Sequence, residues 1–349
     1  MRLLWRGAKW LAVSVVLLVV LLLMPVAYTE VACRGTPVPN SYQPLITDPA
    51  WQRAESRTLM TYPEWHIVHA YDDYAKVIAI GDPHDFAYLR AVAGFWQTLC
   101  PLARKSAEMG GVTTETKMTI YTIGVSFTAE LLAKALYEET LGRLAALVRG
   151  TTRASLDDLS AGQAAAYAAF LQQTPWYKWD FNGDRAELAS ARSDGFRDRE
   201  RALALGLEYS AKAAYARVIA QAVASVGADE LRIRSVVTDL SAARLRLIDG
   251  VSVIAELPEG VVIETDRYRE FTNILQRLAV AGADIAEIAG NDDILITTTG
   301  PNPDVEGPLY SFLRQGYGDW RHLRVLPVAD LASQLRQLNG AQLEHVHDY

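Results

Sequence analysis

An uncharged, largely apolar stretch near the N-terminus, residues 10–29, is the feature that most constrains this chain. Twenty such residues rise about 30 Å as an α-helix, which is enough to cross the hydrocarbon core of a bilayer. Basic residues precede the stretch, and the acidic Glu30 follows it. Because basic residues favour the cytoplasmic side, we expect residues 1–9 in the cytoplasm, a single-pass transmembrane helix over 10–29, and the later residues outside.

The alternative interpretation is a cleaved signal peptide. Such a peptide has an apolar region of about 7–15 residues that ends in an Ala-x-Ala-like cleavage site. The apolar run here is longer, and neither residues 25–27 nor residues 30–32 fit such a site. Cys33 suggests a lipoprotein, but Glu30 three positions earlier is a poor match to a lipobox. The length of the run therefore favours a retained anchor.

Composition limits what the rest of the chain does. The net charge is −7 among 349 residues, without a block rich in Lys or Arg, so nucleic-acid binding is disfavoured. The length suggests about two domains. Cys33 and Cys100 are the two cysteines, and an oxidising compartment would permit a disulfide between them. Two unpaired thiols, with Cys100 buried as a small apolar residue, are the alternative.

After the anchor, the sequence pattern changes first to a proline-rich segment and then to helical periodicity. Several prolines indicate an extended linker over residues 30–50, and helical periodicity follows over residues 51–230. Thr61 and Glu64 form a capping-box pattern that predicts the start of a helix ending at Gly81. Asp82 and Pro83 predict the start of the next helix, which Pro101 should stop. Further helices are expected over residues 117–148, 160–173 (opened by a second capping box at Ser160) and 185–227.

Residues 231–349 read as a mixture of strands and helices. Strands are expected over 244–248 and 251–257, and residues 284–289 and 294–299 should pair as a hairpin around residues 290–293. A helix that ends on glycine before a short strand occurs twice, at Gly282 and at Gly340. This echo predicts a ferredoxin-like α/β sandwich with an extra hairpin strand, so the whole chain is expected to be an α+β protein.

Four short motifs give the chain a resemblance to a known group. Residues 62–65 read Tyr-Pro-Glu-Trp, residues 95–96 read Phe-Trp, residues 287–292 read Glu-Ile-Ala-Gly-Asn-Asp, and residues 343–349 read Leu-Glu-His-Val-His-Asp-Tyr. In these motifs the chain resembles a family of uncharacterised bacterial single-span membrane-anchored envelope proteins. The resemblance covers most of the chain. It implies an anchor in the bacterial cytoplasmic (inner) membrane and a body in the periplasm, and it implies no activity.

The sharpest candidate for chemistry is one face of the helix after Pro63. His66, His69 and Asp73 fall within an arc of about 60° on a helix. Two imidazoles and a carboxylate are suitable ligands for Zn²⁺ or another divalent transition metal, and His84 would add a ligand if the next helix packs antiparallel. The competing interpretation is that these residues form a solvated helix face. The spacing is not the His-Glu-x-x-His of metalloproteases.

Other clusters are less specific. The aromatic residues Trp176, Tyr177 and Trp179 would suit a groove that binds a ligand or partner, although aromatic residues at this density more often pack in a core. His345 and His347 alternate on one strand face, and the loop at residues 290–293 carries carboxylates without the EF-hand pattern.

Established catalytic motifs are missing from the sequence, among them the Walker A loop and the Gly-x-Ser-x-Gly elbow. The sequence therefore favours a non-catalytic, membrane-tethered periplasmic protein that binds an envelope protein partner or a ligand. The alternative is a metal-dependent envelope enzyme that uses the His66, His69 and Asp73 face.

Overall fold

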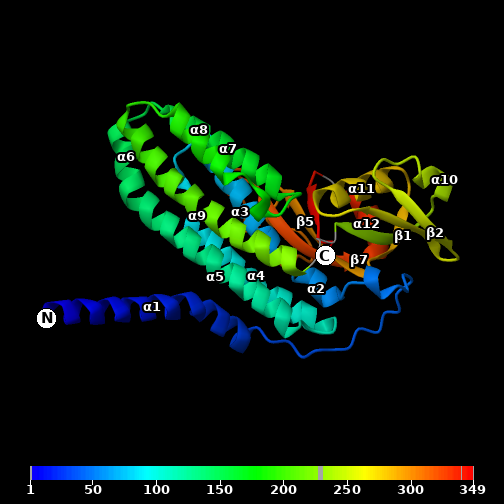
Figure 1. Ribbon diagram of the computed structural model, residues 1–349. Helices are drawn as coiled ribbons and strands as arrows, with labels where there is room; N and C mark the ends of the chain where they lie inside the picture. Colours follow the sequence, from blue (N-terminus) through cyan, green and yellow to red (C-terminus); the bar gives the residue numbers. More distant parts are fainter. Residues whose placement is uncertain (1, 227–230, 339, 349) are drawn as a thin grey trace.

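The computed structural model describes residues 2–226, 231–338 and 340–348. The first element, α1 (Arg2–Ala32), is a long apolar helix that projects from the body of the molecule (Figure 1). Its side chains are exposed over most of its length, and residues Lys9–Ala32 are long and apolar enough to cross a membrane. The remainder combines helices and sheets, so the expected class, mixed helix and sheet behind an N-terminal apolar helix, is confirmed.

The C-terminal end of α1 is built into the folded body. Cys33 and Cys100 form a disulfide, with their Cα atoms 4.7 Å apart. Glu30 pairs with Lys117 at 3.0 Å and accepts a hydrogen bond from the Tyr121 hydroxyl at 2.5 Å. We expected an extended linker over residues 30–50 to separate the membrane helix from the body, whereas the structure joins the end of α1 directly to α4 and α5.

The proline-rich segment that follows α1 is docked along the body rather than free. Residues 34–48 are extended and lead to a 3₁₀ turn, η1 (Pro49–Trp51). The carboxylate of Glu287 accepts hydrogen bonds from the Tyr42 hydroxyl at 2.8 Å and the Ile46 amide at 2.9 Å, and a third from the Leu45 amide. We call residues 35–48 the strap, because they bind the helical part of the chain to the strand-rich part.

A helical bundle occupies the middle of the chain (Figure 1). Its elements are α2 (Glu55–Leu59), α3 (Tyr62–Ile78), η2 (Pro83–Asp85), α4 (Tyr88–Glu108), α5 (Thr114–Tyr137), the π-helical turn η3 (Glu138–Gly142), α6 (Arg143–Arg149), α7 (Ser155–Leu171), η4 (Trp176–Lys178), α8 (Phe181–Ala191) and α9 (Phe196–Val226). Its core contains Tyr62, Phe95, Leu99, Ile120 and Phe127.

One expected cap and two expected helix boundaries in the bundle are wrong, although α3 does begin after Thr61 as predicted. The Thr61 side chain does not cap α3, because Thr61 is already helical and its hydroxyl donates to the Thr58 carbonyl at 2.8 Å. Pro101 lies inside α4 instead of ending it, and the turns that follow bury Leu102 and Ala107. α7 begins before Ser160, because Asp157 accepts a hydrogen bond from the Ala154 amide in its first turn.

Within the described residues, the strands form two four-stranded antiparallel sheets. The first sheet has the order β2 (Ser252–Leu257), β3 (Gly260–Asp266), β1 (Arg232–Thr238), β4 (Asp284–Ile288), and the second has the order β6 (Tyr310–Leu313), β7 (Trp320–Pro327), β5 (Asp293–Gly300), β8 (Gln342–Val346). The associated helices are α10 (Ala242–Leu245), α11 (Arg269–Val280) and α12 (Val328–Arg336).

Two predictions for β segments, a strand and a hairpin, are wrong. Residues 244–248 do not form a strand, because Ser241 caps the short helix α10 by accepting from the Arg244 amide. β4 and β5 do not form a hairpin: β4 pairs with β1, and β5 pairs with β7 and β8. The strands thus belong to two sheets rather than one sandwich with an added hairpin.

The second sheet is buried on both faces, which fixes the arrangement of the molecule. Leu295 and Leu323 pack into the core of the helical bundle. Ile294 and Ile296, which point to the opposite face of β5, pack with α11, α12 and the first sheet. The second sheet therefore lies between the bundle and the first sheet, and its β8 edge runs close to α3 and α11.

Candidate functional site

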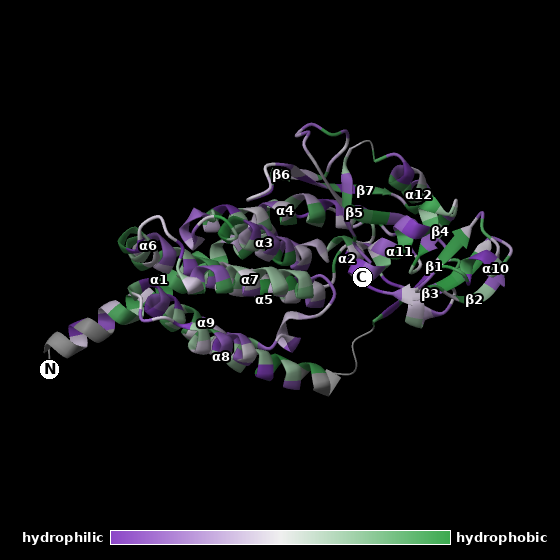
Figure 2. Ribbon diagram, turned by 90° about the horizontal axis from the view of Figure 1, so that it is seen from above, coloured by the Kyte–Doolittle hydropathy of each residue, from purple (hydrophilic) through white to green (hydrophobic). Residues whose placement is uncertain are grey.

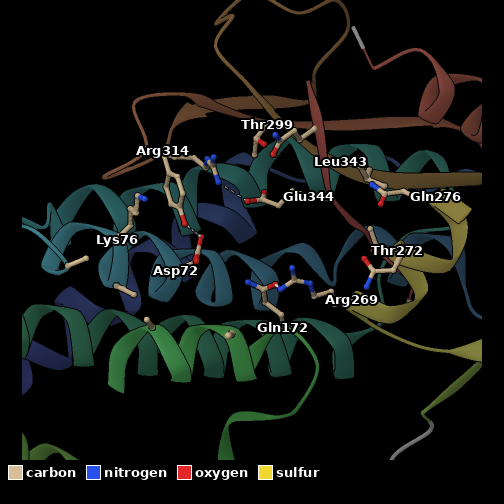
Figure 3. Close-up of a pocket in the computed structure, with 17 residues that line it drawn as sticks. Asp72, Lys76, Gln172, Arg269, Thr272, Gln276, Thr299, Arg314, Leu343 and Glu344 are labelled. Carbon is tan, nitrogen blue, oxygen red and sulfur yellow. Dashed lines mark hydrogen bonds and ion pairs between the residues drawn. The ribbon is translucent and has the colours of Figure 1, made fainter. Parts of the chain in front are cut away.

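A cleft of about 630 Å³ opens between the helical bundle and the second sheet. Residues of α3 and α7 form one wall, and residues of α11, β8 and the loop after β6 form the other (Figure 3). Small side chains create the space, since Ala75, Ala79, Ala165 and Ala169 line the helical wall. This volume falls in the usual range for small-molecule sites.

Polar side chains converge on the cleft from both walls (Figure 3). Its charged lining residues are Asp72, Lys76, Arg269, Arg314 and Glu344, and its amide-bearing ones are Gln172, Asn273, Gln276 and Gln342. Such a lining offers many hydrogen-bond donors and acceptors to a bound molecule.

The acidic side chains of the cleft already have partners. Asp72 accepts a hydrogen bond from the Tyr317 hydroxyl at 2.8 Å, and Glu344 accepts from the Arg321 guanidinium at 2.6 Å. By contrast, within the described residues no carboxylate lies within 4 Å of the charged groups of Lys76 or Arg269. The Lys76 ammonium lies 5.2 Å from the centre of the Tyr317 ring, and Arg269 donates to the Gln172 side chain. The Tyr317 hydroxyl is neutral and leaves the charge of Asp72 in place, whereas Arg314 and Glu344 have ion-pair partners. Lys76 and Arg269 therefore outweigh Asp72, and the net charge left in the cleft is positive.

A buried ion cluster supports the wall of the cleft behind Glu344. The Arg321 side chain is 1% exposed, and it is bonded to both carboxylate oxygens of Glu344. Its guanidinium also lies 3.6 Å from Asp73, whose other oxygen accepts from the Gln315 amide at 3.0 Å. Burial raises the pKa of the Asp73 carboxyl to about 6, against the opposing attraction of Arg321. The cluster fixes the position of Glu344 in the cleft wall.

Histidine and aromatic side chains fill the space next to this cluster. The rings of Trp65 and His345 are stacked with centroids 3.4 Å apart, and His345 lies 4.8 Å from His347. Burial lowers the pKa of His66 to about 4 and of His347 to about 3, and it lowers the pKa values of His69 and His345 well below the usual range. These imidazoles are therefore neutral near pH 7 and act as packing groups.

The histidines of the expected metal site each have a contact of their own. His66 contacts the Ala91 carbonyl through Nε2 at 2.8 Å, and His69 lies 3.6 Å from Glu344. His84 is in η2, where its Nε2 lies 3.9 Å from the Asp85 carboxylate. Among the described residues, no group of three or more His, Cys, Asp or Glu side chains is placed to hold a metal ion.

The interpretation of this helix face as solvated is also wrong, since His66, His69 and Asp73 are each at most 5% exposed. They are covered because α3 lies between the rest of the bundle and the second sheet. Asp73 thus contributes to the ion cluster beneath the cleft.

The aromatic residues proposed for binding lie away from the cleft. Trp176, Tyr177 and Trp179 are half-buried and pack with Tyr167 and Phe181 between α7, α8 and α9. The Trp179 indole donates to Asp184 at 2.7 Å, and the Trp176 ring lies 5.2 Å from Tyr215. Their placement gives them a packing role, and a binding role for them stays a prediction.

Sequence reasoning missed the residues that line the cleft. Lys76, Gln172, Arg269 and Arg314 come from four segments that share no motif. A partial signal was present at residues 342–348, where polar side chains, Glu344 among them, continue through an expected strand. Comparison of the chain with protein-family models, curated proteins and solved structures finds no match.

Proposed function

We propose that this chain is a single-pass protein of the bacterial cytoplasmic membrane whose periplasmic body binds a small, polar, negatively charged ligand in the cleft. The observation that carries this proposal is the net positive charge that Lys76 and Arg269 leave against Asp72 in a cleft of suitable size. We propose binding rather than catalysis, because the charged and polar side chains that line the cleft are sufficient to bind a ligand.

The anchor and its orientation are supported by two features. The contacts of Glu30 with Lys117 and Tyr121 make the end of α1 part of the folded body, which favours retention of α1 over its removal as a signal peptide. The Cys33–Cys100 disulfide favours an oxidising compartment for the body. With basic residues before α1, both features agree with a cytoplasmic N-terminus and a periplasmic body.

The ferredoxin-like description of the C-terminal part belongs to the same proposal. The order of each sheet, numbered from its own first strand, is fourth, first, third, second, with antiparallel neighbours. In the first sheet the connection is β1-α10-β2-β3-α11-β4, the order of a ferredoxin-like unit. We infer that the second sheet is a second unit, in which a loop at residues 301–309 stands in place of the first helix.

Ligand binding can be tested on the full-length protein in lipid nanodiscs. We expect thermal stabilisation by at least one of phosphate, citrate, a sugar phosphate or an acidic monosaccharide, because a ligand at 100 times its Kd stabilises the folded state by about 2.7 kcal/mol. Replacing both Lys76 and Arg269 with alanine should abolish the shift. Isothermal titration would then give the affinity of each variant for the ligand that was found.

A steric variant provides the matched control. Ala169→Trp places a large ring in the cleft, whereas Ala166→Trp adds the same ring to an exposed position of α7 outside the cleft lining. We expect Ala169→Trp to block binding and Ala166→Trp to leave it unchanged. Equal binding by the two tryptophan variants would place the ligand elsewhere. Absence of binding by every probe at millimolar concentration would contradict an anion-binding function.

A further inference from the structure

Large apolar side chains are exposed together at one end of the helical bundle. We call this end the bundle tip; it consists of the end of α3, the start of α4, η3, α6 and the start of α9. Its exposed apolar residues, each between 56% and 86% accessible, are Ile80, Leu89, Leu141, Leu144, Leu147, Val148 and Phe196. Patches of this kind on a folded protein usually mark an interaction surface.

Polar contacts bring these segments together in space. Arg149 of α6 pairs with Asp82, just after α3, at 2.7 Å. Arg153 donates to the Gly81 carbonyl at 2.8 Å. Arg197 of α9 donates to the Gly142 carbonyl in η3. The apolar residues therefore belong to one end of the bundle rather than to scattered loops.

At the bundle tip, exposed apolar side chains and a few exposed ion pairs, such as Arg143 with Glu139, cover a set of buried ion pairs. The buried side chains Glu138, Asp157, Arg197 and Arg201 form ion pairs inside it, where they are at most 6% exposed. Leu144 and Leu147 of α6 point outward instead. Charged groups satisfied inside and leucines outside suit a surface that meets an apolar environment.

The anchor indicates what that environment is. The end of α1 is held to α4 by the disulfide and to α5 by Lys117 and Tyr121. From that contact, α5 and η3 run about 36 Å to Leu141, at about 1.5 Å per residue. Figures 1 and 2 both show α1 and α6 at the same end of the molecule, and α10 at the opposite end.

We propose that the bundle tip inserts its apolar side chains into the surface of the membrane that α1 spans. Because α1 runs from its contact with the body towards the end where α6 lies, the bilayer that it spans would lie next to the bundle tip. The disulfide holds the end of α1 against α4. Arg143 and Arg199 lie beside the apolar residues, are more than half exposed, and pair on the surface with Glu139 and Asp194. Because exposed ion pairs are weak, their guanidinium groups can turn to lipid phosphates instead. The body is then held at the membrane by both α1 and the bundle tip. This inference rests on the anchoring role of α1 in the proposed function.

The test uses full-length protein in nanodiscs that hold one copy each. Leu147→Cys, labelled with an environment-sensitive fluorophore after the native disulfide has formed, reports on the bundle tip. Leu247→Cys is the matched control, because Leu247 is 85% exposed near α10, at the opposite end. Val19→Cys in α1 reports on the anchor itself.

We expect the label at residue 147 to show blue-shifted emission, quenching by spin-labelled lipid and loss of quenching by aqueous iodide. The label at residue 247 should show none of these effects, and the label at residue 19 should show all of them. Iodide quenching at residue 147 equal to that at residue 247 would overturn the docking proposal. If lipid quenching failed at residue 19 as well, the anchor itself would be refuted.

A second copy of the chain is the competing occupant of the bundle tip. Protection of residue 147 that occurs in discs with two copies, but not in discs with one, would assign the surface to self-association and overturn the lipid proposal. Ile80→Cys provides a second position, in the turn after α3, so that a local effect of the label at residue 147 does not decide the result.

Discussion

Arg321 is the residue on which the wall of the cleft depends most. Its guanidinium is buried, and it holds the carboxylates of Glu344 and Asp73 in place. Removing one partner of a buried ion cluster leaves the remaining charges without compensation, and such changes typically cost about 3–5 kcal/mol. Arg321→Met keeps much of the side-chain volume and removes the charge.

We therefore expect Arg321→Met to lower the free energy of unfolding by about 3–5 kcal/mol, as measured by urea denaturation in detergent. Arg232→Met is the control, since Arg232 pairs with Glu264 and Asp266 on the surface and its loss should cost about 1 kcal/mol or less. Similar stabilities for the two variants would mean that the buried cluster is energetically neutral.

The sequence singled out Asp73, His66 and His69 but not their environment. Helical spacing correctly placed them near one another on α3, yet it could not show that the second sheet covers them. That cover comes from Arg321 and Glu344, which are some 250 positions further along the chain. Periodicity distinguishes one face of a helix from another, and it does not identify what packs against that face.

Among the elements, the strap depends on Glu287. This carboxylate is fully buried and accepts three hydrogen bonds from residues 42–46. Glu287→Ala removes all three acceptor contacts and leaves two backbone amides without their partner. We expect the strap to detach and to become sensitive to proteolysis while the two sheets remain folded.

Limited proteolysis with mapping of the cleavage sites would measure this effect. Glu256→Ala is the matched control, because Glu256 lies exposed on β2. New cleavage within residues 35–48 in the Glu287 variant alone is the expected outcome. Resistance equal to that of the unaltered protein would show that Ile46 and its apolar neighbours hold the strap without the carboxylate.

Secondary structure was predictable where one local signal dominated. The apolar run of α1 and the amphipathic pattern of α11 were both correctly assigned from the sequence. Failures occurred where a longer-range contact or a small cap prevailed, as at Pro101 and Ser241. The hairpin expected at residues 284–299 failed because β5 is a central strand that pairs with partners from two other parts of the chain.

At the scale of the whole molecule, the proposed topology makes a direct prediction. Alkaline phosphatase fused through a flexible linker after Tyr349 should be active in cells, because its folding needs an oxidising compartment. The same reporter placed after Lys9, before the apolar run, should be inactive. Activity of neither fusion, with a C-terminal fluorescent reporter active instead, would place the body in the cytoplasm.

The thiol state provides a second measurement of the same topology. In cells, Cys33 and Cys100 should resist alkylation until a reductant is added, since the structure joins them in a disulfide. The sequence suggested this pairing as one of two possibilities and provided no distance to decide between them. The sequence likewise indicated a helical part and a part with mixed strands and helices. It did not indicate the cleft between them, because the cleft arises from contacts between residues distant in the chain.

The closing contacts of the fold have a consequence for how the protein is made. Residues 42–46 can make their hydrogen bonds only after Glu287 has been synthesised. Thr61 likewise contacts His347, which is 286 positions later. Folding dominated by such distant pairs is slow, and its intermediates expose apolar surface. In the proposed topology, the emerging helices would remain incomplete while translocation continues, and the chain would then be a client for periplasmic chaperones that shield unfinished domains.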